Sequence, residues 1–84
     1  MAPSILILSF ISSPNGRRRA EELLEDLFAK HDLGKIVGGG QDLRTGDFDL
    51  EIATPDAGSL LEQVERFLAN EQDLELRDAV LIER

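Results

Sequence analysis

The side chains best suited to chemistry are four carboxylates that flank a short turn. Asp42 precedes the turn, and three more acids alternate with apolar residues in the segment 47–52, which reads DFDLEI. A period of two predicts a strand with one face buried and the other exposed. The exposed face of this strand would carry Asp47, Asp49 and Glu51.

Carboxylates in such a row could bind a hard cation such as Mg²⁺ or Ca²⁺. Residues two apart on a strand are about 6.6–6.8 Å apart, so their side chains diverge unless a loop curls around them. The row also lacks the Asp, Gly and distant Glu spacing of an EF-hand. We therefore interpret Asp47, Asp49 and Glu51 as solvated or partner-facing surface, and we expect neither a metal nor a cofactor.

Gly38, Gly39 and Gly40 form a second unusual stretch. Phosphate-binding glycine loops need a helix directly after the glycines, so that its first amides meet the anion. Here a strand and a turn follow instead, which is typical of an edge strand with a bulge. An edge without side chains can also accept another strand by β-augmentation, from a partner or from a second copy.

Arg17, Arg18 and Arg19 stand at the start of a predicted helix. Cations there oppose the helix dipole by roughly a few tenths of a kcal/mol each, and such a local conflict sometimes marks a functional position. The arginines could bind a phosphate or an acidic partner. They could also pair with the glutamates of residues 21–25, three or four positions further along the same helix.

No other motif indicates an enzyme. His31 is the single histidine and falls near the end of the same predicted helix, where a cation suits the dipole. The chain has no cysteine, no Gly-x-Ser-x-Gly nucleophile elbow and no nucleotide-binding fingerprint. We therefore expect no catalytic residues.

Charge and composition restrict the partners. Nine basic and seventeen acidic residues give a net charge of −8, which argues against nucleic-acid binding because Lys and Arg contacts to phosphate supply most of that affinity. The chain has no Tyr or Trp to stack on RNA bases. Its apolar run at residues 5–11 is far shorter than the roughly 20 residues of a membrane span. We expect a cytoplasmic protein that binds neither nucleic acid nor membrane.

Four strands follow from alternation and from β-branched runs bounded by breakers. They are predicted over residues 4–12, 35–42, 47–53 and 74–82. The last of these would place Leu74, Leu76, Val80 and Ile82 on one side. The loop between the second and third strands is predicted to have Gly46 at a positive φ.

Two helices connect these strands, each with one apolar stripe at the i, i+3, i+4 and i+7 positions. The first stripe is Ala20, Leu23, Leu24, Leu27 and Phe28, and the second is Ala57, Leu60, Leu61, Val64, Phe67 and Leu68. The first begins at Ser13, Pro14 or Asn15 and stops before Gly34. The second begins at the Thr-Pro-Asp sequence of residues 54–56, with the threonine hydroxyl as its cap.

The order β-α-β-β-α-β over residues 1–84 predicts a single α+β domain. Right-handed crossovers would place both helices on one face of a four-stranded antiparallel sheet with strand order 4-1-3-2. At the level of element order, the whole chain resembles the ferredoxin-like (split βαβ) superfamily. The resemblance rests on no catalytic motif, and it implies a fold without implying a function.

The uncovered face of this sheet is the main functional indication, because the first strand is apolar on both sides. One side carries Ile5, Ile7 and Ile11, and the other carries Leu6, Leu8 and Phe10. The helices cover only one of these sets, and the sequence does not determine which. A contiguous exposed apolar patch indicates an interface, unless the stems of long side chains such as Lys35 shield it.

The sequence therefore predicts a small, acidic, non-enzymatic protein-interaction module. It would bind a protein partner, or itself as a homodimer, through the open sheet face or the glycine-rich edge, and an inhibitor or immunity-type role is one version. The residues predicted to bind the partner are Gly38, Gly39, Gly40, Asp47, Asp49, Glu51, Arg17 and Arg18. The alternative is a metal- or anion-binding enzyme or sensor that uses the Asp42, Asp47, Asp49 and Glu51 cluster or the Arg17–Arg19 helix start.

Overall fold

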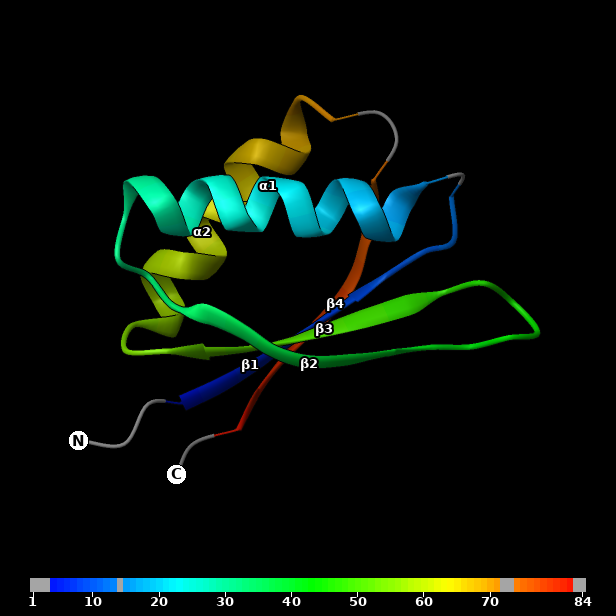
Figure 1. The fold of residues 1–84 in the computed structure, drawn as a ribbon, viewed down its shortest axis with the longest axis horizontal. Helices are drawn as coiled ribbons and strands as arrows, with labels where there is room; N and C mark the ends of the chain where they lie inside the picture. The colour runs from blue at the N-terminus through cyan, green and yellow to red at the C-terminus, as the bar shows by residue number, and fades with distance from the viewer. Residues whose placement is uncertain (1–3, 14, 72–73, 83–84) are drawn as a thin grey trace.

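The computed structural model describes residues 4–13, 15–71 and 74–82. Both helices pack on one side of the sheet (Figure 1), which confirms the predicted α+β class. The elements in chain order are β1 (Ser4–Phe10), α1 (Gly16–Lys30), β2 (Lys35–Gln41), β3 (Phe48–Thr54), α2 (Ala57–Ala69) and β4 (Leu76–Ile82).

The four strands form one antiparallel sheet in the order β2-β3-β1-β4. Read from β4, this is the order 4-1-3-2 that the sequence predicted. β1 and β3 are therefore central, and β2 and β4 are the two edges. The glycine-bearing strand β2 has one free edge, and so has β4.

The core lies between the helices and one face of the central strands. Leu8, Leu50 and Ile52 are almost fully buried there, and the rings of Phe10 and Phe48 stack with their centroids 5.0 Å apart. Both helices contribute side chains that close over this layer, namely Ala20, Leu24, Leu27, Leu60 and Val64.

The position of the core settles the choice that the sequence left open for β1. Leu6 and Leu8 face the helices and are buried, whereas Ile5 and Ile7 face the uncovered side and stay partly exposed. The open face of the sheet therefore carries the isoleucines of β1.

β4 departs from the predicted alternation because Arg77 is an extra residue, in a β-bulge against β1. The bulge offsets the alternation by one, so Leu76 faces the core while Val80 and Ile82 face the open side. Leu74 precedes the strand and is buried in the core. The prediction that these four apolar residues share one side is therefore wrong.

The start of α2 also differs from the prediction. Its N-cap is Asp56, whose Oδ1 accepts the backbone N–H of Ser59 at 3.1 Å, and Pro55 lies before the cap. Thr54, the predicted cap, is the fully buried last residue of β3. Its hydroxyl donates to the carbonyl of Leu33 at 2.5 Å and accepts the N–H of Asp56 at 3.1 Å.

α1 begins at Gly16, after Asn15 in the left-handed conformation with φ 60°. The Asn15 side chain makes no capping hydrogen bond. Pro14, one of the predicted starting residues, lies outside the described residues. In the loop between β2 and β3, the predicted positive φ of Gly46 is confirmed at 81°.

Candidate functional site

The face of the sheet without helices carries a small lattice of side chains set by the strand registers. Residues opposite one another on paired strands point to the same side, so they form rows across the sheet. The three rows on the open side are Lys35–Ala53–Ile5–Ile82, Gly38–Glu51–Ile7–Val80 and Gly40–Asp49–Ser9–Asp78.

Four apolar side chains gather at the corner of this face where β1 and β4 meet. Val80 and Ile82 are each 45% exposed, and Ile5 and Ile7 beside them are partly buried. The helices pack on the other side, so no described element covers this corner. A contiguous apolar group of this kind is a candidate surface for contact with another molecule.

Three acids share the same face toward its other end. Asp49 and Asp78 flank Ser9 in one row, and because neighbouring strands lie about 4.8 Å apart, the two backbones are about 10 Å apart across a small side chain. Within the described chain, Asp49 and Glu51 form no ion pair or hydrogen bond through their carboxylates, and Asp78 accepts only the backbone N–H of the residue after it, at 2.9 Å.

Gly38 and Gly40 allow two of these carboxylates to lie over the edge strand. A β-carbon on residue 38 would stand 2.9 Å from Glu51 Oε2, and one on residue 40 would stand 3.2 Å from Asp49 Oδ1. A bulge at Val37 places Gly38 opposite Glu51. The structure therefore brings the predicted glycine edge and the predicted acidic row together on one surface.

The acidic end of the face opens into a hollow beside the β2–β3 hairpin. The hollow measures about 650 Å³ when the part open to solvent is counted. Ser9, Gly40 and Asp49 line it from the sheet, and Asp47 and Arg77 line it from its end. A side chain from another molecule could enter this space beside the free carboxylate of Asp49.

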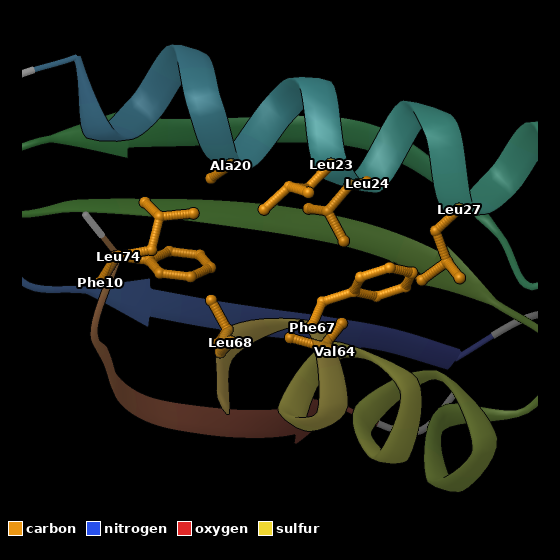
Figure 2. A pocket seen from close by; sticks show the side chains of 9 residues that line it. All are labelled: Phe10, Ala20, Leu23, Leu24, Leu27, Val64, Phe67, Leu68 and Leu74. Atoms are coloured by element: carbon orange, nitrogen blue, oxygen red, sulfur yellow. The ribbon is translucent and has the colours of Figure 1, made fainter. Parts of the chain in front are cut away.

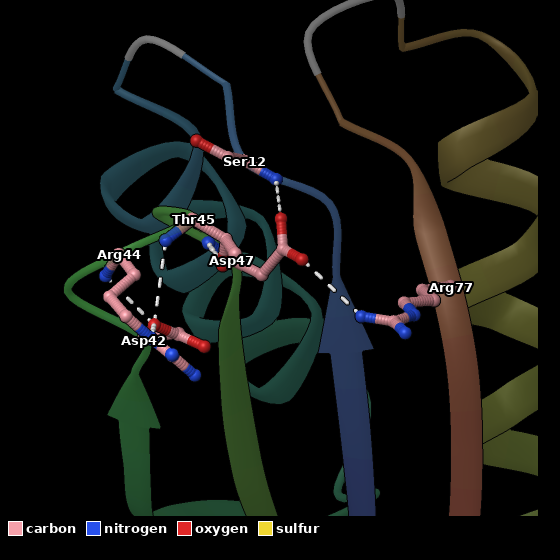
Figure 3. A network of polar contacts seen from close by, with 6 residues as sticks. All are labelled: Ser12, Asp42, Arg44, Thr45, Asp47 and Arg77. Atoms are coloured by element: carbon pink, nitrogen blue, oxygen red, sulfur yellow. Dashed lines mark hydrogen bonds and ion pairs between the residues drawn. The ribbon is translucent and has the colours of Figure 1, made fainter.

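Asp47 holds three segments together at the end of the hollow (Figure 3). Its Oδ1 accepts the backbone N–H of Ser12 at 2.7 Å, and its Oδ2 accepts Nη1–H of Arg77 at 3.3 Å. Asp42 is engaged inside the hairpin loop, where its Oδ1 accepts the backbone N–H of Arg44 at 2.8 Å. Both carboxylates therefore stabilise the local structure.

The four carboxylates that the sequence grouped as a candidate cation site therefore fall into two pairs with different surroundings. Asp42 and Asp47 bind neighbouring backbone and Arg77, while Asp49 and Glu51 lie over β2. Across residues 4–13, 15–71 and 74–82, no three acidic or histidine side chains are placed to hold a metal ion.

The three arginines at the start of α1 lie on the helical side of the sheet, apart from the glycines and acids of the open face. Each of them is in an ion pair with a glutamate. The pairs are Arg17–Glu21 at 3.1 Å, Arg18–Glu22 at 3.3 Å and Arg19–Glu71 at 3.2 Å. The structure thus does not bring Arg17 and Arg18 together with the other residues predicted to bind a partner.

A second hollow, which the sequence did not indicate, lies between the two helices (Figure 2). Leu23 and Leu24 of α1 point toward Val64 and Phe67 of α2, and Phe10 lies to their left in this view. The space measures about 280 Å³, including its open part. Only hydrocarbon side chains line it, so it offers no acid, base or metal ligand. The helix stripes predicted these side chains but not the separation of the helices.

Asp78 and Ser9 belong to the cross-strand row Gly40–Asp49–Ser9–Asp78. The sequence singled out neither of these two residues. The signal for Asp78 was weak, because it was visible only as an interruption in an apolar strand. Its place beside Ser9 depends on the register between β4 and β1, including the bulge at Arg77.

Comparison of the chain with protein-family models, with curated proteins and with solved structures gives no match. In the part of the chain that the structure describes, no helix is both long enough and apolar enough to cross a membrane.

Proposed function

We propose that this chain is a ferredoxin-like (split βαβ) domain that works as a non-enzymatic protein-binding module, through the open face of its sheet. The element order and the antiparallel sheet with both helices on one side support the ferredoxin-like assignment. The free apolar corner and the free acids of the open face support the binding role.

The observation that carries the proposal is the uncovered apolar corner formed by Ile5, Ile7, Val80 and Ile82. Burying one large aliphatic side chain contributes about 1.5–3 kcal/mol, and these four gain only part of that while they face solvent. A partner that covers the corner would bury the exposed parts of these side chains and so gain the remaining free energy of burial.

The edge strand β2 supports a second mode of contact in the same module. Gly38, Gly39 and Gly40 present no side chains along this edge, so the backbone of another strand could approach it closely. A homodimer and an inhibitor that covers a partner's working surface are both versions of this proposal.

The proposal of a non-enzymatic role is supported by how the polar side chains are used. Asp47 and Asp42 hold the hairpin, and the arginines of α1 are in ion pairs. The two hollows contain no described arrangement of an acid and a base positioned against a nucleophile.

The test compares proteins retained from the source cell by three immobilised forms of the full chain. These are the wild type, the double variant Val80→Thr/Ile82→Thr, and Leu43→Thr in the hairpin loop, where Leu43 is 96% exposed. Threonine keeps the β-propensity of the strand. We expect one protein that the wild type and Leu43→Thr retain and that the double variant loses.

Light scattering after size-exclusion chromatography, at several concentrations, examines the homodimer version in the same three forms. A wild type that remains a monomer at every concentration and retains no protein that the double variant loses would contradict the proposed function.

A further inference from the structure

We propose that the partner of the open face is a basic protein segment, in which an Arg or Lys side chain stands next to apolar side chains along an extended strand. This inference rests on the proposed function and adds the chemistry of the partner. The cation would lie over Ser9 at the side of the hollow, between Asp49, which lines the hollow, and Asp78 on the neighbouring strand. The apolar side chains would cover the corner between β1 and β4.

Charge on the face is the first argument. Its three rows contain the carboxylates of Asp49, Glu51 and Asp78 and one cation, Lys35, at the corner diagonally opposite Asp78. Arg77 at the end of the hollow is in an ion pair with Asp47, so its charge is already balanced there. The chain as a whole carries −8. Like charges on the two sides of an interface are unfavourable, whereas a basic partner is attracted from a distance.

The second argument is that Asp49 and Glu51 have no cationic partner among the described residues. Elsewhere on the molecule, carboxylates beside arginines are already in ion pairs, as at Glu21, Glu22 and Glu62. No described cation reaches Asp49 or Glu51, although both are partly buried. A partner's guanidinium can therefore bind there without breaking an existing ion pair.

Geometry is the third argument, because it fixes the spacing of the partner's side chains. Asp49 and Asp78 flank the small residue Ser9, so a guanidinium placed over Ser9 lies between two carboxylates. The next row along β1 contains Ile7 and is about 6.6–6.8 Å away, the distance between residues two apart on a strand. An extended segment that runs along β1 would therefore place its cation two residues from its first apolar side chain.

A second copy of this chain matches the face less well. Its own open face offers three acids and one lysine, and the arginines of α1 are on the opposite side in ion pairs. Two copies would bring together a total charge of −16, which is twice the −8 of one chain.

The test uses a capped peptide of sequence Arg-Ser-Val-Ser-Val, in which the arginine and both valines project from one face of an extended strand. The control peptide has glutamate in place of the arginine. Each is titrated into the ¹⁵N-labelled full chain, and amide shifts are followed up to millimolar peptide. We expect shifts at residues 5–9 and 78–82, and an affinity for the glutamate peptide lower by about tenfold or more.

Matched variants separate a local carboxylate effect from net charge. Asp49→Asn/Asp78→Asn and Glu25→Gln/Asp26→Asn each remove two negative charges. The second pair lies exposed on α1 and makes no described ion pair. We expect the first double variant to lose about tenfold in affinity for the arginine peptide, and the second to bind as the wild type does.

Three outcomes would overturn the inference. They are no binding of the arginine peptide, equal binding of the glutamate peptide, and equal losses in the two double variants. Two further results would overturn it while leaving the proposed function intact: a wild-type dimer that Val80→Thr/Ile82→Thr abolishes, and a retained partner whose binding is unchanged by Asp49→Asn/Asp78→Asn.

Discussion

Gly39 of β2 lies opposite Leu50 of β3, and a β-carbon on residue 39 would stand 2.6 Å from the backbone oxygen of Asp49. Real β-carbons essentially never approach an atom so closely, so the two strands at this point are held together at a distance that only glycine allows. The flanking glycines are different. A β-carbon on residue 38 or 40 would have its closest contact with a carboxylate oxygen at the end of a flexible side chain, at 2.9 Å and 3.2 Å respectively.

The first prediction follows from this difference. Gly39→Ala must push β2 away from β3, and we expect it to lower the free energy of unfolding by about 1–3 kcal/mol, as overpacking does. Gly40→Ala meets only Asp49 Oδ1 at 3.2 Å, so it should change stability by less than about 1 kcal/mol in either direction. Urea denaturation of both variants measures the difference, and equal values would contradict the close approach at residue 39.

The second prediction concerns the buried hydroxyl of Thr54. Thr54→Val keeps the shape of the side chain but leaves the carbonyl of Leu33 and the N–H of Asp56 without their partner. We expect a loss of about 1–3 kcal/mol in the free energy of unfolding. Thr54→Ser is the control because it keeps the hydroxyl. A valine variant as stable as the serine variant would show that these two hydrogen bonds contribute little.

The third prediction ranks the two contacts of Asp47. Asp47→Ala removes the acceptor for the Ser12 N–H and the partner of Arg77, and we expect it to cost about 0.5–1.5 kcal/mol. Arg77→Gln removes only the exposed ion pair, which is worth about 0.2–1 kcal/mol and weakens with salt. Thermal melts at low and high salt separate them: the arginine variant should approach the wild type in high salt, and the alanine variant should not.

The fourth prediction is a pH dependence at the start of α2. The backbone N–H of Ser59 donates to the Asp56 carboxylate, and this hydrogen bond holds the pKa of that carboxyl below its ordinary value of 3.8. Because the pKa is lower in the folded chain, the carboxylate stabilises the fold above the unfolded pKa. That contribution is lost as the pH falls through the folded pKa.

Asp56→Asn isolates this effect, because asparagine keeps an oxygen acceptor for Ser59 and does not titrate in this range. The difference in melting temperature between the wild type and Asp56→Asn should favour the wild type more near neutral pH than below pH 3.8. A difference that stays constant with pH would contradict the role of the ionised cap.

Much of the fold was predictable because it depends on local periodicity. The alternation at residues 47–52 gave β3 and its buried face, since Phe48, Leu50 and Ile52 recur with the period of a strand. The apolar stripes of the two helices likewise named the residues that now close the core. Element order then restricted the sheet topology to few choices.

Only one of the two bulges was predictable. The glycine run indicated an edge strand with a bulge, and β2 is an edge strand with a bulge, although the extra residue is Val37, just before the glycines. Arg77 is an extra residue only with respect to β1 beside it, so no pattern within β4 reveals it. Each bulge changed the composition of the open face. The bulge in β4 placed Val80 and Ile82 there, and the bulge in β2 set Gly38 against Glu51.

The residue types of the candidate site were predictable, but their arrangement was not, because it depends on pairing between strands. The glycines and the acids were visible as residue types, but their meeting depends on pairing between β2 and β3. The cap of α2 depended on a distant partner as well. Thr54 and Asp56 are both good capping residues, and the carbonyl of Leu33 engages the hydroxyl of Thr54 within the sheet.

Arg77 has one further consequence, because the bulge takes up this one residue, so the residues after it keep the faces that they would have if Arg77 were absent. Its deletion would straighten β4 while Val80 and Ile82 kept their present outward orientation, since regular alternation from Leu76 gives the same result. The deletion would remove the ion pair that links β4, across the end of β1, to Asp47. The apolar corner of the open face and the ion pair that joins β4 to the residue before β3 therefore depend on different residues, so either can be changed without the other.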